Sequence, residues 1–231
     1  MAITLYDLCG AEAERRFSPF CWRTKMALAH KGLPVETVPW RFTEKDKLPQ
    51  PNAGRVPVIV DDGRVVHDST AIADYLEERY PDRPPLFGGD GARGLARFVQ
   101  NWTETVLHLG LIRLVLVDIH GRLGPADQAY FREDREKRFN TTLEEVVQDR
   151  EARLPAFRAS LDPLRRTVER QQFVSGEAPA YADYVVFGGF QWARAVSDFE
   201  VLAEGDPVRA WRGRMLDLFD GLARRSPAYG D

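Results

Sequence analysis

The segment Arg16-Phe17-Ser18-Pro19-Phe20-Cys21-Trp22-Arg23-Thr24-Lys25 decides how the first part of this chain is expected to fold. It follows an apolar stretch, residues 3–8, whose composition predicts a strand. Ser18 has the residue type of a helix N-cap, and Pro19 has the fixed φ angle favoured at the first position of a helix. We therefore predict a helix from Pro19, with the Ser18 hydroxyl at its positive end, where free N–H groups and the helix dipole stabilise an anion.

The remaining patterns divide the chain into two domains. Further strands are predicted at residues 35–39, 56–60 and 64–67 and a further helix at 69–80, and the first helix should end near residue 31. The Asp61-Asp62-Gly63-Arg64 turn predicts an antiparallel hairpin, because Asp-Gly tolerates the positive φ angles of tight turns. A proline-rich linker, about residues 81–93, follows. Long amphipathic patterns then replace strand patterns, so we expect an α/β domain at residues 1–83 and an all-helical domain at residues 93–231.

Two local features of the helical part carry separate expectations. Pro155 and Pro163 fall inside helical patterns and should kink or interrupt them. The charged run from Phe131 to Arg138 has the composition of a solvated helix face.

Composition excludes several function classes. The formal net charge is -3 and the isoelectric point is near 5.9, which gives no electrostatic case for a nucleic-acid partner. No window has the length and apolar character of a membrane span, and the first residues lack a signal-peptide pattern, so we expect a cytoplasmic protein with no membrane partner. Cys9 and Cys21 are expected to be reduced thiols. The histidines and cysteines lack metal-ligand spacing, so no metal is expected.

Ser18 is the leading catalytic candidate. A hydroxyl both accepts and donates hydrogen bonds, so Ser18 is either a plain N-cap, a donor to a bound thiolate, or both. Tyr6, in the first strand, is the second choice for that donor. Cys21 completes a Ser18-x-x-Cys21 pattern that resembles a dithiol motif with its first sulfur replaced by oxygen, and it is either a core residue or a redox thiol.

Two further segments are candidates for binding a ligand. Proline cannot donate a ladder hydrogen bond, so Val56-Pro57 indicates a sheet edge or a ligand-facing position. A cis peptide bond there would direct the Val56 backbone N–H and C=O toward an extended peptide ligand, whereas the alternative is an ordinary trans proline. Asp68 and Ser69 precede a helix, where they either form a capping box or hold the amine and carboxylate of an amino-acid head group.

Together these segments resemble the glutathione transferase superfamily. The resemblance rests on Ser18-Pro19-Phe20, on Val56-Pro57, on Asp68-Ser69, and on Phe173 to Asp183 in the helical domain. One departure is Ala180, which stands where the family usually has a capping Ser or Thr. A closer resemblance to bacterial glutathione-dependent β-aryl etherases is carried by residues 18–25, 55–63, 80–84, 143–154 and 217–222.

The resemblance implies a thioredoxin-like domain followed by a helical domain, glutathione as co-substrate, and a homodimer. It further implies that Ser18 stabilises the glutathione thiolate and that glutathione is bound by Val56, Pro57, Asp68 and Ser69. A small hydrophobic electrophile, such as an aryl ether, is expected between the domains, near Phe20, Trp102, His108 and Trp192. Two alternatives remain: thiol–disulfide reduction through Cys21, or a non-catalytic member that binds glutathione or a protein partner.

Overall fold

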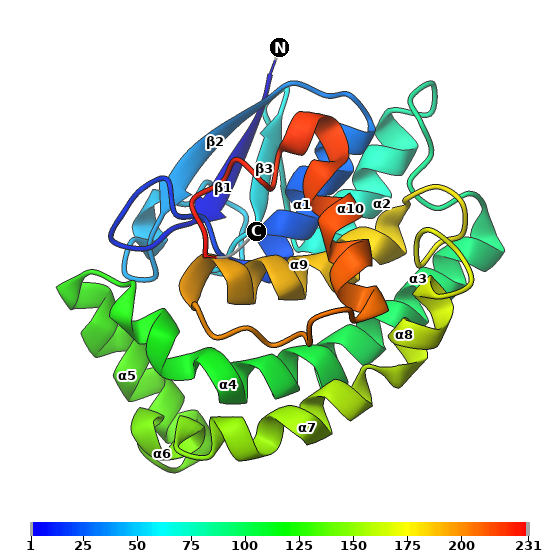
Figure 1. The fold of residues 1–231 in the computed structure, drawn as a ribbon. Coiled ribbons are helices and arrows are strands. Elements are labelled where there is room, and N and C mark those ends of the chain that lie inside the picture. Colours follow the sequence, from blue (N-terminus) through cyan, green and yellow to red (C-terminus); the bar gives the residue numbers. More distant parts are fainter. Residues whose placement is uncertain (1, 230–231) are drawn as a thin grey trace.

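The first part of the molecule is a four-stranded mixed sheet in the order β2-β1-β3-β4 (Figure 1). The computed structural model describes residues 2–229. β1 (Ile3–Leu8) pairs in parallel with β2 (Val35–Trp40) and antiparallel with β3 (Val58–Asp61). β4 (Arg64–His67) pairs antiparallel with β3. All four predicted strands are therefore present.

The hairpin between β3 and β4 confirms the predicted turn. Asp62 and Gly63 have φ angles of 48° and 80°, the positive values that a tight two-residue hairpin loop requires. β3 begins at Val58, two residues later than predicted, because Pro57 has no N–H to donate to a ladder. The segment Val56-Pro57 thus lies at the end of the sheet, just before β3.

Helices α1 (Pro19–His30) and α2 (Ser69–Arg79) pack on each other, and a short 3₁₀ turn, η1 (Lys45–Lys47), follows β2. Both helices begin at their predicted residues. The most extensive contact of α1 is with α9 (Tyr181–Val196), a buried helix of the second part. The first turn of α1, where Ser18 lies, is therefore held between the two domains.

No further strand is named in the described residues beyond β4, which confirms the all-helical second domain. Figure 1 shows α9 between the sheet domain and α4. The helices of this domain other than α9 are α3 (Asp90–Trp102), α4 (His108–Gly121), α5 (Pro125–Phe139), α6 (Leu143–Val147), α7 (Arg150–Ser160), α8 (Asp162–Val168) and α10 (Pro207–Gly221).

The two internal prolines behave differently. Pro163 lies in the first turn of α8, where its missing N–H would have no intrahelical partner, and the chain breaks between α7 and α8 as predicted. Pro155 lies inside α7, which continues through it to Ser160, so of the predicted kink or break no break occurs at this position.

A π-helical turn, Thr103–Leu107, joins α3 to α4 and was not predicted. One extra residue in a turn shifts the phase of the apolar pattern between the two sides, but each side keeps helical spacing, so the spacing within each segment does not reveal the turn. π-helical turns are rare and occur frequently at functional sites. This one ends directly before His108, whose position it helps to set.

The start of α9 shows how the chain compensates for Ala180. Asp183 is fully buried, and its carboxylate accepts hydrogen bonds from the backbone N–H groups of Val174, Ser175 and Ala180 at 2.7–3.2 Å. The Trp211 indole N–H donates to the same carboxylate at 3.1 Å. The reciprocal half of the capping box is therefore kept by Asp183 although Ala180 offers no side-chain oxygen.

Within residues 2–229, no helix combines the length and the apolar composition that crossing a bilayer requires.

Candidate functional site

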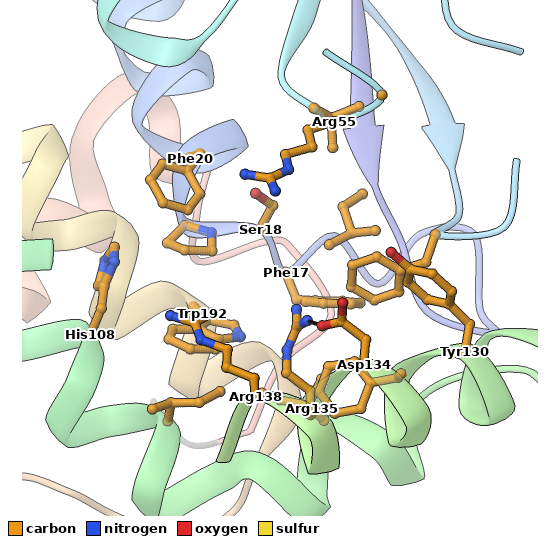
Figure 2. Close-up of a pocket in the computed structure, with 18 of the residues that line it drawn as sticks. Phe17, Ser18, Phe20, Arg55, His108, Tyr130, Asp134, Arg135, Arg138 and Trp192 are labelled. Carbon is orange, nitrogen blue, oxygen red and sulfur yellow. Dashed lines mark hydrogen bonds and ion pairs between the residues drawn. The ribbon is translucent and has the colours of Figure 1, made fainter. Parts of the chain in front are cut away.

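A cavity of about 970 Å³ lies between the sheet domain and the helical domain (Figure 2). The sheet domain contributes the turn that starts α1 and the loop at residues 53–56. The helical domain contributes residues of the π-helical turn, α4 and α5, and Trp192 of α9. Because both domains supply the walls, the site depends on how α1 packs against α9.

Ser18 lies in the cavity wall and is 3% exposed. Its Oγ accepts a hydrogen bond from the Cys21 backbone N–H at 3.2 Å, so Ser18 caps α1. This bond uses the oxygen as an acceptor and leaves the hydroxyl hydrogen available to donate. The first turn of α1 contains no acidic residue that would cancel the positive potential of the helix end. Capping and donating to an anion are therefore compatible at this position.

The Val56–Pro57 peptide bond is cis, as the ligand-facing interpretation of this segment required. Val56 lines the cavity, whereas Pro57 is buried beside it and does not. A second cis bond, Gln50–Pro51, was not predicted. Arg55 also lines the cavity, and in Figure 2 its guanidinium and the Ser18 hydroxyl point toward the same part of it.

Asp68 and Ser69 lie next to this segment, because β4 ends at His67 beside the start of β3. Asp68 Oδ1 accepts the Thr70 and Ala71 backbone N–H groups at 2.9 and 3.0 Å and so caps α2. Its φ angle of 72° is unusual for a residue other than glycine. Ser69 is buried, and its carbonyl accepts the Tyr181 hydroxyl at 2.9 Å. Neither residue lines the cavity itself, and both follow the end of β4, beside the start of β3.

His108 is placed in the cavity wall between two aromatic rings. Its ring centroid lies 5.6 Å from that of Phe20 and 5.8 Å from that of Trp192, both of which also line the cavity. Burial, with a smaller contribution from the nearby Arg23 charge, lowers the pKa of His108 to about 3. The imidazole is therefore neutral at physiological pH. Trp102, the last residue of α3, packs against the core and lies outside the cavity lining.

A buried arginine supports the wall around His108. Arg23 of α1 is fully buried, and its Nη1 donates to Glu104 Oε1 at 3.0 Å. Its guanidinium carbon also lies 4.7 Å from the centroid of the Phe20 ring. Glu104 belongs to the π-helical turn and lines the cavity. This ion pair ties the site-facing turn of the helical domain to α1.

Cys21 does not have the properties that redox catalysis needs. Its side chain is fully buried, and burial together with the Asp7 carboxylate raises the pKa of the thiol far above its ordinary value. A reactive thiol requires exposure and a lowered pKa. Tyr6, the second choice for activating a thiol, lies in β1 and does not line the cavity.

The far wall of the cavity was not predicted. Tyr130, Phe131, Asp134, Arg135 and Arg138 of α5 line it. Asp134 and Arg138 are solvent-exposed, as a solvated face requires, whereas Phe131 is buried. Composition alone does not reveal the cavity, because α5 lies across it and presents every third or fourth residue to it.

Within the described residues, no group of three or more His, Cys, Asp or Glu side chains is arranged to hold a metal ion.

Family models match both domains. A model described as the glutathione S-transferase N-terminal domain matches residues 13–84, and one described as the C-terminal domain matches residues 94–222. Together they cover most of the chain, including Ser18, the Val56–Pro57 segment and the whole of α5.

Known proteins are similar over almost the same length. "Glutathione transferase GST 23" of Zea mays is 28% identical over 210 residues, which are 87% of this chain and 82% of that protein. The crystal structure of the glutathione transferase GSTFuA3 of Phanerochaete chrysosporium superposes with a TM-score of 0.75 and 26% identity, covering 96% of this chain and 92% of that one.

A solved structure with bound glutathione shares the fold. The glutathione S-transferase CsGST63524 of Ceriporiopsis subvermispora, in complex with glutathione, superposes with a TM-score of 0.78 and 24% identity, covering 95% of this chain and 97% of that one. The matched family models, supported by these similarities, lead to one conclusion: the chain belongs to the glutathione S-transferase family.

Proposed function

We propose that this chain is a serine-type glutathione transferase in which Ser18 donates a hydrogen bond to the glutathione thiolate. The observation that carries the proposal is the Ser18 hydroxyl itself, which lies at the N-terminus of α1, in the wall of the cavity, with its hydrogen left available by the cap. A free cysteine thiol has a pKa of about 8.5, so at neutral pH only a few per cent is thiolate. A donor and a positive helix end both favour the thiolate.

Glutathione would lie along the end of the sheet. Val56 would pair with its peptide backbone, and the Asp68-Ser69 segment would hold its γ-glutamyl end, with the exposed Asp68 carboxylate accepting from the amine. Arg55 directly precedes Val56 and lines the same cavity, so its guanidinium can pair with the glycine carboxylate. These contacts would position the sulfur close to Ser18.

The second substrate would be an aromatic electrophile, and β-aryl ethers beside a ketone are the class we favour. The glutathione sulfur would attack the carbon that carries the ether oxygen, forming a C–S bond while the C–O bond breaks. The phenolate leaves with the bonding electron pair and takes a proton from water. Phe20, His108 and Trp192 would surround this substrate, and the neutral His108 imidazole could hydrogen-bond its carbonyl or phenolate oxygen.

The test is a pH titration of bound glutathione, followed by the ultraviolet absorbance of its thiolate, in wild type, Ser18→Ala and Ser18→Thr. We expect a lowered pKa in wild type, a return toward about 8.5 in Ser18→Ala, and recovery in Ser18→Thr, which keeps a hydroxyl. The protein's own thiols contribute little signal, because burial raises the pKa of both Cys9 and Cys21.

Turnover provides the second readout. Loss of one donor to a developing or bound anion reduces kcat by about 10²-fold, so Ser18→Ala should lose far more in kcat than in glutathione affinity. Phenol release from a β-aryl ether ketone, compared with turnover of 1-chloro-2,4-dinitrobenzene, tests the substrate class separately. Glutathione binding with an unshifted thiol pKa in wild type would instead favour a non-catalytic binding protein.

A further inference from the structure

The wall opposite Ser18 carries an unusual concentration of positive charge. Figure 2 shows Arg135 and Arg138 extending from α5 into the cavity, on the side away from Ser18 and Arg55. Lys45 of η1 also lines this cavity, beside Tyr130, with its Nζ 5.0 Å from the centre of the ring. The chain as a whole is acidic, with a net charge of -3, so this local excess is not a reflection of composition.

The carboxylates in the cavity neutralise only part of this positive charge. Among the described residues, two carboxylates line the cavity: Glu104 is paired with the buried Arg23 at 3.0 Å, and Asp134 is paired with Arg135. Within residues 2–229, no carboxylate partner is found for Arg138 or Arg55. Both guanidinium groups are exposed, so water weakens their attraction for an anion, but a cation without a counter-ion in a cavity wall still favours an anionic ligand over a neutral one.

The two unneutralised arginines lie on opposite sides of the site. Arg55 precedes Val56, and in the proposed function its guanidinium pairs with the glycine carboxylate of glutathione. The proposed function gives no role to Arg138. The lining of the cavity also contains the aromatic rings of Phe131, Phe139 and Trp192. This combination of rings and one unneutralised guanidinium suits a ligand that is itself aromatic and negatively charged.

We propose that the second substrate is an aromatic compound bearing a carboxylate, and that Arg138, with Arg135 beside it, binds that carboxylate on the wall opposite Ser18. This inference rests on the proposed function for the identity of the first substrate. The carboxylate would anchor the far end of the molecule, while its electrophilic carbon faces the glutathione sulfur. Arg138 is then a specificity residue that takes no part in activating the thiol.

The experiment uses two unreactive probes of nearly identical shape, naphthalene-2-carboxylate and naphthalene-2-carboxamide. Their binding to the glutathione-saturated protein is measured by calorimetry in wild type, Arg138→Gln and Lys137→Gln. Lys137 is an exposed neighbour on α5 that does not line the cavity, so its variant removes the same charge from the same helix. Because Arg138 is solvent-exposed, we expect the carboxylate to bind wild type only about five-fold more tightly than the amide.

Arg138→Gln should abolish this preference, and Lys137→Gln should keep it. Equal binding of the two probes by wild type would overturn the inference, as would a preference that survives in Arg138→Gln. A raised KM for glutathione in Arg138→Gln, with probe binding unchanged, would also overturn it, because the arginine would then serve the glutathione carboxylate.

The proposed function is tested separately, by conjugation of a neutral electrophile. If wild type shows the carboxylate preference, Arg138→Gln loses it, and no electrophile is conjugated, the anion subsite is supported while the transferase proposal fails. If neutral electrophiles are conjugated and wild type shows no carboxylate preference, the transferase proposal stands and the subsite fails.

Discussion

At the scale of single residues, the side chains that cap α1 and α2 also have the chemistry that the proposed function needs. Ser18 caps α1 through its oxygen, and this bond does not use its hydrogen. Asp68 caps α2 through one carboxylate oxygen, which leaves the other for an amine. A sequence pattern identifies such residues as caps but cannot distinguish a cap from a binding group. The position of Ser18 in the cavity wall is what the structure adds to that pattern.

His108 gives a pH-dependent prediction at this scale. Its pKa is lowered to about 3 in the folded chain, whereas an ordinary histidine has 6.5, so between these values the unfolded chain binds a proton that the folded chain does not. The free energy of unfolding must therefore decrease as the pH falls below 6.5, by at most about 1.4 kcal/mol per pH unit from this group. His108→Phe removes the contribution and keeps a ring between Phe20 and Trp192.

Urea unfolding of wild type and His108→Phe at pH 8, 6.5 and 5 measures the contribution of His108 to the free energy of unfolding. Between pH 6.5 and 5 the variant should lose roughly 1–2 kcal/mol less than wild type. His30, whose pKa burial also lowers, remains in both proteins and cancels in the comparison. Parallel pH dependences would show that His108 is as accessible to protons in the folded chain as in the unfolded one, and this account of its burial would be wrong.

At the scale of elements, the site depends on how closely α9 approaches the start of α1. A Cβ added at Gly188 would lie 2.4 Å from the Pro19 carbonyl oxygen, a backbone atom that cannot move without shifting α1. A Cβ added at Gly213, in α10, would meet no neighbouring atom within 4 Å. The two glycines therefore form a matched pair inside helices.

Gly188→Ala should destabilise the protein, and Gly213→Ala should stabilise it. Alanine favours a helix over glycine by up to about 1 kcal/mol, which Gly213→Ala should gain in full. At Gly188 the clash, typically about 1–3 kcal/mol for an overpacked site, outweighs that gain and displaces Ser18. Thermal unfolding measures both changes, and glutathione affinity should fall in Gly188→Ala alone. Stabilisation by both alanines would mean that the α1–α9 contact is looser than described.

The elements also show why prediction succeeded for the sheet and failed for the far wall. The effects on backbone conformation of the Asp62-Gly63 turn, Pro19 and Pro57 extend over only a few neighbouring residues. These effects can therefore be predicted from local sequence. Arg138 faces the cavity only because α5 crosses it, which depends on helix packing far away in the sequence. The π-helical turn before His108 keeps helical spacing on each of its sides, so local spacing does not reveal it either.

At the scale of the whole molecule, the cavity joins two walls of different chemistry. The wall formed by the sheet domain offers hydrogen-bonding groups at Ser18 and Val56, and the wall formed by α5 offers aromatic rings and Arg138. The Arg23–Glu104 ion pair connects the domains beside this cavity, and its arginine is fully buried. A buried charge left without its partner is costly, so this contact resists separation of the two walls.

The outer surface of α3 gives the last prediction. Leu95 and Phe98 are 69% and 71% exposed, far more than large apolar side chains usually are in this protein. They are three residues apart in α3 and therefore lie side by side on one face of the helix. The nearby Arg93 and Arg97 are both paired with Asp74, which offsets part of their positive charge. Two copies can bury such a face against each other in a symmetric interface, and we propose that the expected homodimer forms through it.

Phe98→Asp should therefore convert a dimer to a monomer, because burying a phenylalanine contributes about 1.5–3 kcal/mol per copy and a buried unpaired carboxylate opposes association. Light scattering over a range of protein concentrations measures the change. Leu109→Asp, at a residue 45% exposed that lines the cavity, adds the same charge elsewhere and should leave the dimer intact. A wild-type monomer would refute the dimer, and a dimeric Phe98→Asp would place the interface on another surface.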